Sequence, residues 1–241
     1  MEKSKVLIRI FCIALAIAVF CSSILFALAQ KSNSVFSPPL SFSLVIDAGH
    51  GGIDGGAVGV TTGNKESDLN LDVAFLLNNY AKNNLTVTLT RQSVDGLYGD
   101  AGAGFKRRDM QKRKEIIQSV NPDIVVSIHM NKFPSPTRRG AQVYYQKGDD
   151  ISMGFASVMQ EMLNTYINIP KLNRAFSIGT GDFYICKIKK PTIIIECGFL
   201  SSPEDDKLLA QKSYRDKIAY TIYNGIISYF MQNTTFIPSL N

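Results

Sequence analysis

Hydrophobic and polar positions follow two different periods along the chain, and these predict strands and helices in alternation. Short apolar runs predict buried strands, at residues 44–47, 86–90, 123–129, 140–145 and 192–196. Apolar residues at helical spacing predict helices at residues 66–80, 106–120 and 151–166, and one or two helices across residues 205–232. Strands that alternate with helices, several of them continuously apolar, are typical of a parallel sheet covered on both faces. The pattern therefore predicts a single three-layer α/β domain with a mainly parallel twisted sheet flanked by helices.

The first 29 residues carry a different pattern, which predicts export. Three basic residues among the first nine precede an apolar stretch from Ile10 to about Ala29. A helix of this length matches a bilayer core of about 30 Å, and the final Ala27-Leu28-Ala29 resembles a signal-peptidase site. A cleaved signal peptide and a retained membrane anchor both stay open, and both place the domain outside the cytoplasm. Residues 30–43, rich in serine and proline, predict a linker before the domain at residues 44–241.

Composition narrows the class of protein. Of the 241 residues, 45% are hydrophobic and the net charge is +6, which disfavours both a disordered chain and a protein directed at nucleic acid. We expect no nucleic-acid partner, and contact with a membrane only through the N-terminal segment. Four cysteines are too few for a disulfide-rich scaffold. Cys186 and Cys197 could pair outside the cell, but no spacing fixes their geometry.

Histidine is the informative residue type, because the chain contains only His50 and His129. Both follow predicted strands, and Glu196 ends a third, so all three lie at the sheet edge where α/β proteins bind ligands. Glu66 begins the first long predicted helix, sixteen positions after His50. Two imidazoles and a carboxylate are the ligand set of a catalytic zinc ion. Glu196 ends an apolar run that would raise its pKa, which suits a general base.

Each of these residues also has an ordinary structural interpretation. A single histidine after a strand is more often structural than a ligand. Glu66 could complement the helix dipole, and Glu196 could pair with a lysine. The glycine-rich loop around His50 lacks the Lys-Ser/Thr ending of a phosphate-binding loop. The pattern alone therefore leaves the metal site as a hypothesis.

Four motifs, in order across residues 44–230, resemble the zinc-dependent N-acetylmuramoyl-L-alanine amidases of the type 3 family. They are VIDAGHGGIDGGA at residues 45–57, KESDLNL at 65–71, TR at 90–91 followed by SIHMN at 127–131, and IECGFLSS at 195–202. The resemblance implies that His50, Glu66 and His129 bind zinc and that Glu196 is the catalytic base. It also implies hydrolysis of the amide between N-acetylmuramic acid and L-alanine in peptidoglycan, with the metal holding the oxyanion.

Residues 135–136 and 140–145 resemble the germination branch of this family, which acts on the spore cortex. That resemblance implies removal of stem peptides so that muramic-δ-lactam can form, in the spore cortex or intermembrane region. Some division amidases insert a regulatory helix before the last catalytic strand. Residues 145–192 have room for one ordinary helix and a short loop, so we expect no such device. An accessory protein that controls activity or zinc binding is an alternative, and the sequence does not name one.

The remaining candidates concern substrate binding. Arg91 closes a predicted strand and could be a substrate clamp or a solvated ion pair, and Asn131 is a second candidate. The basic clusters at residues 106–108 and 112–114 could face anionic glycan or teichoic polymer, but they are more typical of one solvated helix face. Two other functions stay open. A zinc carboxypeptidase-like peptidase would need an arginine for a terminal carboxylate, and a non-catalytic wall-binding module would have no need of Glu196.

Overall fold

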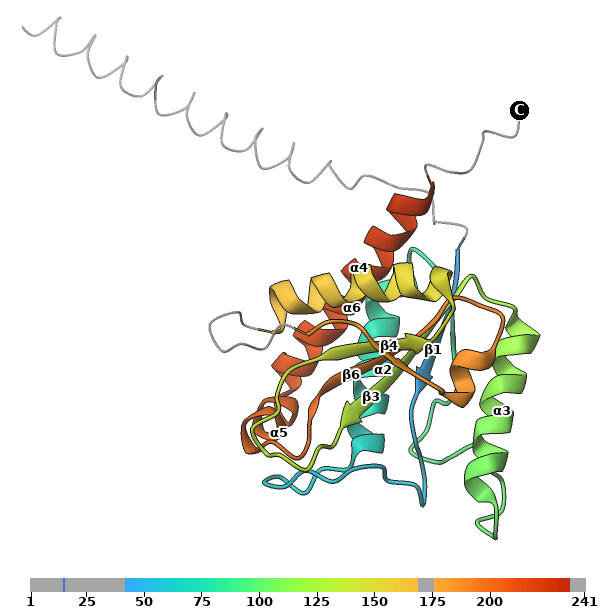
Figure 1. Cartoon of the computed structure of the whole chain (residues 1–241), viewed down its shortest axis with the longest axis vertical. Coiled ribbons are helices and arrows are strands. Elements are labelled where there is room, and N and C mark those ends of the chain that lie inside the picture. Colours follow the sequence, from blue (N-terminus) through green and yellow to red (C-terminus); the bar gives the residue numbers. More distant parts are fainter. Residues whose placement is uncertain (1–14, 16–41, 169–175, 235–241) are drawn as a thin grey trace, which may run out of the picture. The chain divides into compact units, whose positions relative to one another are not determined.

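The computed structural model describes residue 15, residues 42–168 and residues 176–234 (Figure 1). The predicted signal or anchor at residues 1–29 lies outside the described residues, apart from residue 15, and so does most of the predicted linker. Among the described residues, we find no helix with the length and apolar character needed to cross a membrane. The predicted linker reaches residue 43, whereas the first strand already begins at Ser43 and Phe42 packs against the core.

A six-stranded sheet forms the centre of the domain. Its strands are β1 (Ser43–Ala48), β2 (Thr86–Leu89), β3 (Ile124–Asn131), β4 (Gln142–Gln146), β5 (Gly179–Gly181) and β6 (Thr192–Phe199). Their order across the sheet is β2-β1-β3-β6-β4-β5. All neighbouring pairs are parallel except β4 and β6, which run antiparallel. The mainly parallel sheet predicted from the apolar runs is therefore confirmed.

Helices cover both faces of this sheet, as the three-layer prediction requires (Figure 1). One face packs against α2 (Glu66–Ala81), α4 (Asp150–Tyr166) and α6 (Lys212–Thr234). The other packs against α3 (Phe105–Val120) and the short 3-10 helix η2 (Tyr184–Lys187). A further short helix, α5 (Pro203–Leu209), follows β6. The sequence pattern did not predict β5 or η2, because neither carries a periodic apolar stretch.

Alternation along the strands divides the side chains between the two faces. In β6, Ile193 and Ile195 pack on the α2/α4/α6 face, whereas Ile194 packs on the α3/η2 face. Toward the carboxyl ends of the strands, the α3/η2 face changes from apolar to polar. The polar residues there are Asp47 on β1, Ser127 and His129 on β3, and Glu196 on β6. This change of character places the polar residues at the edge where the candidate site forms.

The solvated helix face predicted for α3 is wrong at Arg113. Lys106 and Lys112 have side-chain exposures of 67% and 55%, but that of Arg113 is 1%. Its guanidinium forms ion pairs with Asp47 and Asp109, at N–O distances of 2.7 and 2.6 Å. A buried cation persists when it is paired and hydrogen-bonded, and these two carboxylates provide the pairing.

The two described cysteines are both buried free thiols. Cys186 belongs to the cluster on the α3/η2 face, and Cys197 belongs to the cluster on the α2/α4/α6 face. The sheet therefore separates them, and they do not form the disulfide that the sequence left open.

Candidate active site

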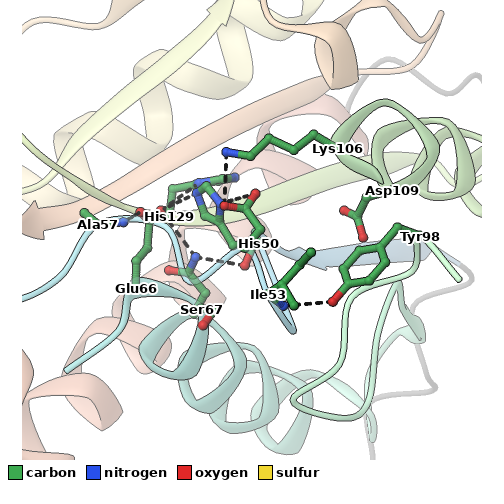
Figure 2. Close-up of polar contacts among 12 residues, drawn as sticks. His50, Ile53, Ala57, Glu66, Ser67, Tyr98, Lys106, Asp109 and His129 are labelled. Carbon is green, nitrogen blue, oxygen red and sulfur yellow. Dashed lines mark hydrogen bonds and ion pairs between the residues drawn. The ribbon is translucent and has the colours of Figure 1, made fainter. Parts of the chain in front are cut away.

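The side chains of His50, Glu66 and His129 converge at the carboxyl end of the sheet (Figure 2). Glu66 Oε1 lies 3.1 Å from His50 Nε2 and 2.9 Å from His129 Nδ1. One candidate ligand atom from each residue lies within 4.8 Å of the other two. His50 follows β1, Glu66 begins α2 and His129 lies on β3, so three separate elements bring together the residues that the motifs single out.

The arrangement fits a divalent metal ion. Two imidazole nitrogens and one carboxylate oxygen, beside an open cleft, match the donor set of a catalytic zinc site with one position left for substrate or water. The glycines of the loop leave the space that these donors need. A Cβ at Gly56 would lie 2.5 Å from Glu66 Oε2, and a Cβ at Gly49 would overlap the ring of His129.

Backbone donors hold the Glu66 carboxylate in place. Glu66 Oε2 accepts a hydrogen bond from the Ala57 N–H at 2.8 Å, and Oε1 accepts one from the Met130 N–H at 3.1 Å. Burial by itself raises the pKa of Glu66, but hydrogen bonds with His129 and His50 outweigh it and hold that pKa well below its usual range. Glu66 is therefore ionised at neutral pH, which is the form that binds a metal.

A second carboxylate orients His50. Asp54 Oδ2 lies 3.0 Å from His50 Nδ1, and Asp54 Oδ1 lies 3.2 Å from Lys106 Nζ. A carboxylate on one ring nitrogen fixes the orientation of a metal-binding imidazole and leaves the other nitrogen for the metal. His50 also has a φ of 60°, in the left-handed region, which costs a non-glycine residue of order 1–3 kcal/mol. The surrounding contacts must hold His50 in this conformation.

Glu196 is paired in register with His129 across β6 and β3. Its Oε2 is buried and has no hydrogen-bond partner in the described part of the chain. Burial raises the pKa of Glu196 to about 7, and the Glu66 carboxylate adds to this while His129 and His50 oppose it. Native structures rarely bury a carboxylate oxygen without a partner, and those that do so in clefts are often functional. Glu196 is therefore a candidate for proton exchange with a group in the cleft.

These residues line one open cleft of about 390 Å³, within the usual size range of ligand sites. Asn131, the second substrate-binding candidate, also lines it. Three further charged residues line it: Asp54, Lys106 and Lys132. The sequence reasoning missed Asp54 and Lys132, and it named Lys106 only within a basic cluster that could face anionic glycan. Asp54 had a signal that could have found it, because it follows His50 by four residues in the same glycine-rich loop.

Arg91, the first substrate-binding candidate, does not line the cleft. It is 3% exposed and has no carboxylate within ion-pair distance among the described residues. Its guanidinium donates hydrogen bonds to the carbonyl oxygens of Ala48, Gly49, Ser67 and Ser93. Four of its five N–H groups are used inside the fold, and Arg91 is buried away from the cleft, so the structure contradicts both the substrate clamp and the solvated ion pair predicted for Arg91.

Comparison with known proteins decides the family. The sequence profile of the N-acetylmuramoyl-L-alanine amidases matches residues 44–228. The chain belongs to this family. The amidase resembles the germination-specific N-acetylmuramoyl-L-alanine amidase of Bacillus subtilis, with 34% identity over 216 residues that cover 86% of this chain and 90% of the relative.

Two solved structures support the same assignment. The CwlD amidase from Clostridioides difficile, in complex with the GerS lipoprotein, is 34% identical, with a TM-score of 0.74 over 80% of this chain and 100% of that chain. An N-acetylmuramoyl-L-alanine amidase from Clostridium difficile 630 is 27% identical, with a TM-score of 0.70 over 80% of this chain and 98% of that one. These likenesses favour an amidase over the carboxypeptidase-like and non-catalytic alternatives. Peptidoglycan is its substrate, so the amidase acts outside the cytoplasm.

Proposed function

We propose that the amidase uses zinc held by His50, Glu66 and His129, with Glu196 as general base, to cleave the amide between N-acetylmuramic acid and L-alanine. The observation that carries this proposal is the unpartnered Glu196 Oε2, which lines the same cleft as the three candidate ligands. When bound, zinc supplies a Lewis acid that lowers the pKa of water and stabilises negative charge developing on the carbonyl oxygen.

Glu196 provides the proton transfers that the reaction requires. Its ionised Oε2 takes a proton from the attacking water as the new C–O bond forms. It then gives that proton to the alanine nitrogen as the C–N bond breaks, so that the products are a lactyl carboxylate and a free stem peptide. A base with a pKa near 7 performs both steps well at neutral pH, because neither protonation state dominates.

The cleft also offers groups for substrate binding. Asn131 is the proposed contact for a polar group of the substrate, because it lies on the cleft wall beside His129. Lys106 and Lys132 bring positive charge to the same wall, and stem peptides carry carboxylates. We assign these lysines to the orientation of the anionic peptide and not to the chemical step.

The relatives support a more specific biological role. Because one is named germination-specific and another was solved with a lipoprotein, we extend the proposal to the spore cortex. There the amidase would remove stem peptides so that muramic-δ-lactam forms, under the control of an accessory protein. Residues 1–29 would act as the signal or anchor that delivers the catalytic domain at residues 44–241 to this location.

The proposal is tested by counting zinc and identifying the cleaved bond with the full chain. Elemental analysis should find about one zinc per wild-type chain, and mass spectrometry of digested muropeptides should find intact stem peptides with alanine at their N-terminus. His50→Ala should lose zinc and activity together. Normal zinc content in that variant would remove His50 from the ligand set. Cleavage between amino acids of the stem would replace the amidase reaction by a peptidase reaction.

A further inference from the structure

Two buried arginines lie beneath the loop that carries His50, and the proposed mechanism uses neither. Arg91 follows β2 and Arg113 lies on α3, and their residue exposures are 3% and 1%. Neither lines the catalytic cleft. Burial of a charged guanidinium group costs free energy unless its N–H groups are hydrogen-bonded. The hydrogen-bond partners of the two arginines therefore show which parts of the structure they stabilise.

Their donors converge on three consecutive carbonyl groups. Arg91 Nε and Arg113 Nη1 both donate to the Ala48 oxygen, at 2.9 and 2.6 Å. Arg91 Nη2 donates to the Gly49 oxygen at 3.1 Å, and Arg113 Nη2 donates to the His50 oxygen at 2.6 Å. Strand β1 ends at Ala48, so the two guanidinium groups supply the donors that sheet pairing would otherwise provide. They thereby hold the backbone of His50 in its left-handed conformation.

The same side chains connect His50 with Glu66. Arg91 Nη2 also donates to the Ser67 oxygen at 2.6 Å, one residue after Glu66 at the start of α2. One guanidinium group therefore joins the loop of one proposed ligand to the helix of another. Asn70 Nδ2, also on α2, donates to the same Gly49 oxygen at 3.1 Å, so both side chains connect the backbone beside His50 with α2, and Arg91 does so with a rigid, planar group.

The network is electrically balanced. Arg113 pairs with Asp47 and Asp109, and Asp47 accepts further hydrogen bonds from Thr90 and Ser127. The two arginines and two aspartates together carry no net charge. The network therefore adds no net positive charge beneath the candidate metal ligands.

We infer that Arg91 and Arg113 are positioning residues that set His50 and Glu66 in the arrangement of bound ligands before the metal arrives. Ligands that are already ordered lose less conformational freedom on binding, which increases affinity. This inference rests on the proposed function, because His50 and Glu66 are the ligands proposed there.

The test compares Arg91→Lys and Arg113→Lys with Arg215→Lys in the full chain. Arg215 is a matched control, because it also pairs with a carboxylate, that of Asp72, and donates to a carbonyl, that of Leu209, yet neither of these bonds reaches the loop of His50 or the first turn of α2. Competition with a chelator measures the zinc dissociation constant. The visible spectrum of the cobalt-loaded protein reports the ligand geometry. We expect zinc binding about 10–100-fold weaker and an altered cobalt spectrum in both test variants, with neither change in Arg215→Lys.

Circular dichroism establishes which variants fold. Wild-type zinc affinity and cobalt spectrum in the folded test variants would overturn the inference, and so would an equal loss in Arg215→Lys. Where neither arginine variant folds, Asp109→Asn takes their place, because it keeps both arginines and removes one partner of Arg113. It should weaken zinc binding several-fold, and unchanged binding would overturn the inference. Normal zinc content in His50→Ala would instead contradict the proposed function itself.

Discussion

The two faces of the sheet differ in what they bury. The face toward α2, α4 and α6 is apolar along the whole length of the strands, with residues such as Phe155, Ile195 and Ile222 fully buried. The face toward α3 and η2 has a smaller apolar cluster and then buries charged groups, including Asp47 and Arg113, near the carboxyl ends of the strands. Apolar burial stabilises the fold without directing any one side chain, whereas paired charges have defined directions.

This difference assigns separate tasks to the two faces. We expect substitutions in the apolar cluster of the α2/α4/α6 face, to which the candidate ligand Glu66 does not belong, to change the free energy of unfolding and leave zinc affinity unchanged. We expect substitutions on the α3/η2 face to change turnover or zinc affinity more than stability. A core substitution on the α2/α4/α6 face that weakens zinc binding, or one on the α3/η2 face that changes only stability, would contradict this division between the two faces.

The largest expected effect is that of Glu196→Gln on the α3/η2 face. Glutamine has a similar shape but cannot take a proton from water, so turnover should fall about 10²–10⁴-fold. Zinc content and melting temperature should stay near those of the wild type, because Glu196 Oε2 has no partner to lose. Stem-peptide release, measured beside elemental analysis, checks both statements. Turnover within tenfold of the wild type would end the assignment of Glu196 as the base.

The pKa of Glu196 gives this prediction a pH dependence. Because burial raises that pKa to about 7, Glu196 takes up a proton as the pH falls below neutrality and can no longer act as a base. Wild-type turnover should therefore decrease about tenfold per pH unit on the acid side of that pKa. The residual turnover of Glu196→Gln should lack this decrease.

The next effect belongs to the α2/α4/α6 face. Ile222→Ala removes a fully buried side chain from α6 and should lower the free energy of unfolding by about 2–5 kcal/mol. Zinc affinity should not change while the protein is folded. Lys217→Ala, an exposed position on the same helix, serves as the control and should change stability by less than about 0.5 kcal/mol. Denaturant unfolding with and without zinc measures both. A weaker zinc affinity in Ile222→Ala would show that the faces are coupled.

The contrast between the apolar face and the face that buries charged groups also explains which features could be predicted from the sequence. Apolar periodicity depends on neighbouring residues, so the helices and most strands of the α/β domain followed from it. The motifs singled out His50, Glu66 and His129 as a group, because each stands in a short pattern of its own. The antiparallel direction of β4 could not be predicted, since its apolar pattern does not depend on strand direction.

Buried charges are the part that the sequence could not predict. Arg113 stands between two lysines, and helical spacing alone does not show that it faces the sheet. Its partner Asp47 is 66 residues away along the chain. Arg91 donates hydrogen bonds to backbone carbonyl groups. Every residue type has such a group, so the sequence does not show which residues Arg91 contacts. Only Asp109, one helical turn before Arg113, offered a local hint.

A smaller effect is expected for Asp54→Asn. Asparagine removes the charged partner of His50 Nδ1, so zinc binding should weaken about 10–100-fold, while the melting temperature changes little because Asp54 is partly exposed. Asp182→Asn is the control, since Asp182 also pairs with a lysine, Lys187, at the surface. Chelator competition measures both variants. If the two bind zinc equally well, Asp54 does not orient His50.

The smallest expected effect uses the buried cysteines as reporters, one on each face. Burial raises the pKa of Cys186 to about 12 and also raises that of Cys197, so neither thiol should be alkylated until its surroundings open. Cys186 lies on the short η2 helix in the smaller cluster, whereas Cys197 lies in β6 between two other strands. The η2 helix can open without breaking the sheet. Cys186 should therefore react several-fold faster than Cys197 in native buffer, as measured by mass spectrometry of the separated peptides. Equal rates would mean that both faces open in one cooperative unfolding event. The two faces would then differ in the chemical groups that they bury but not in local stability.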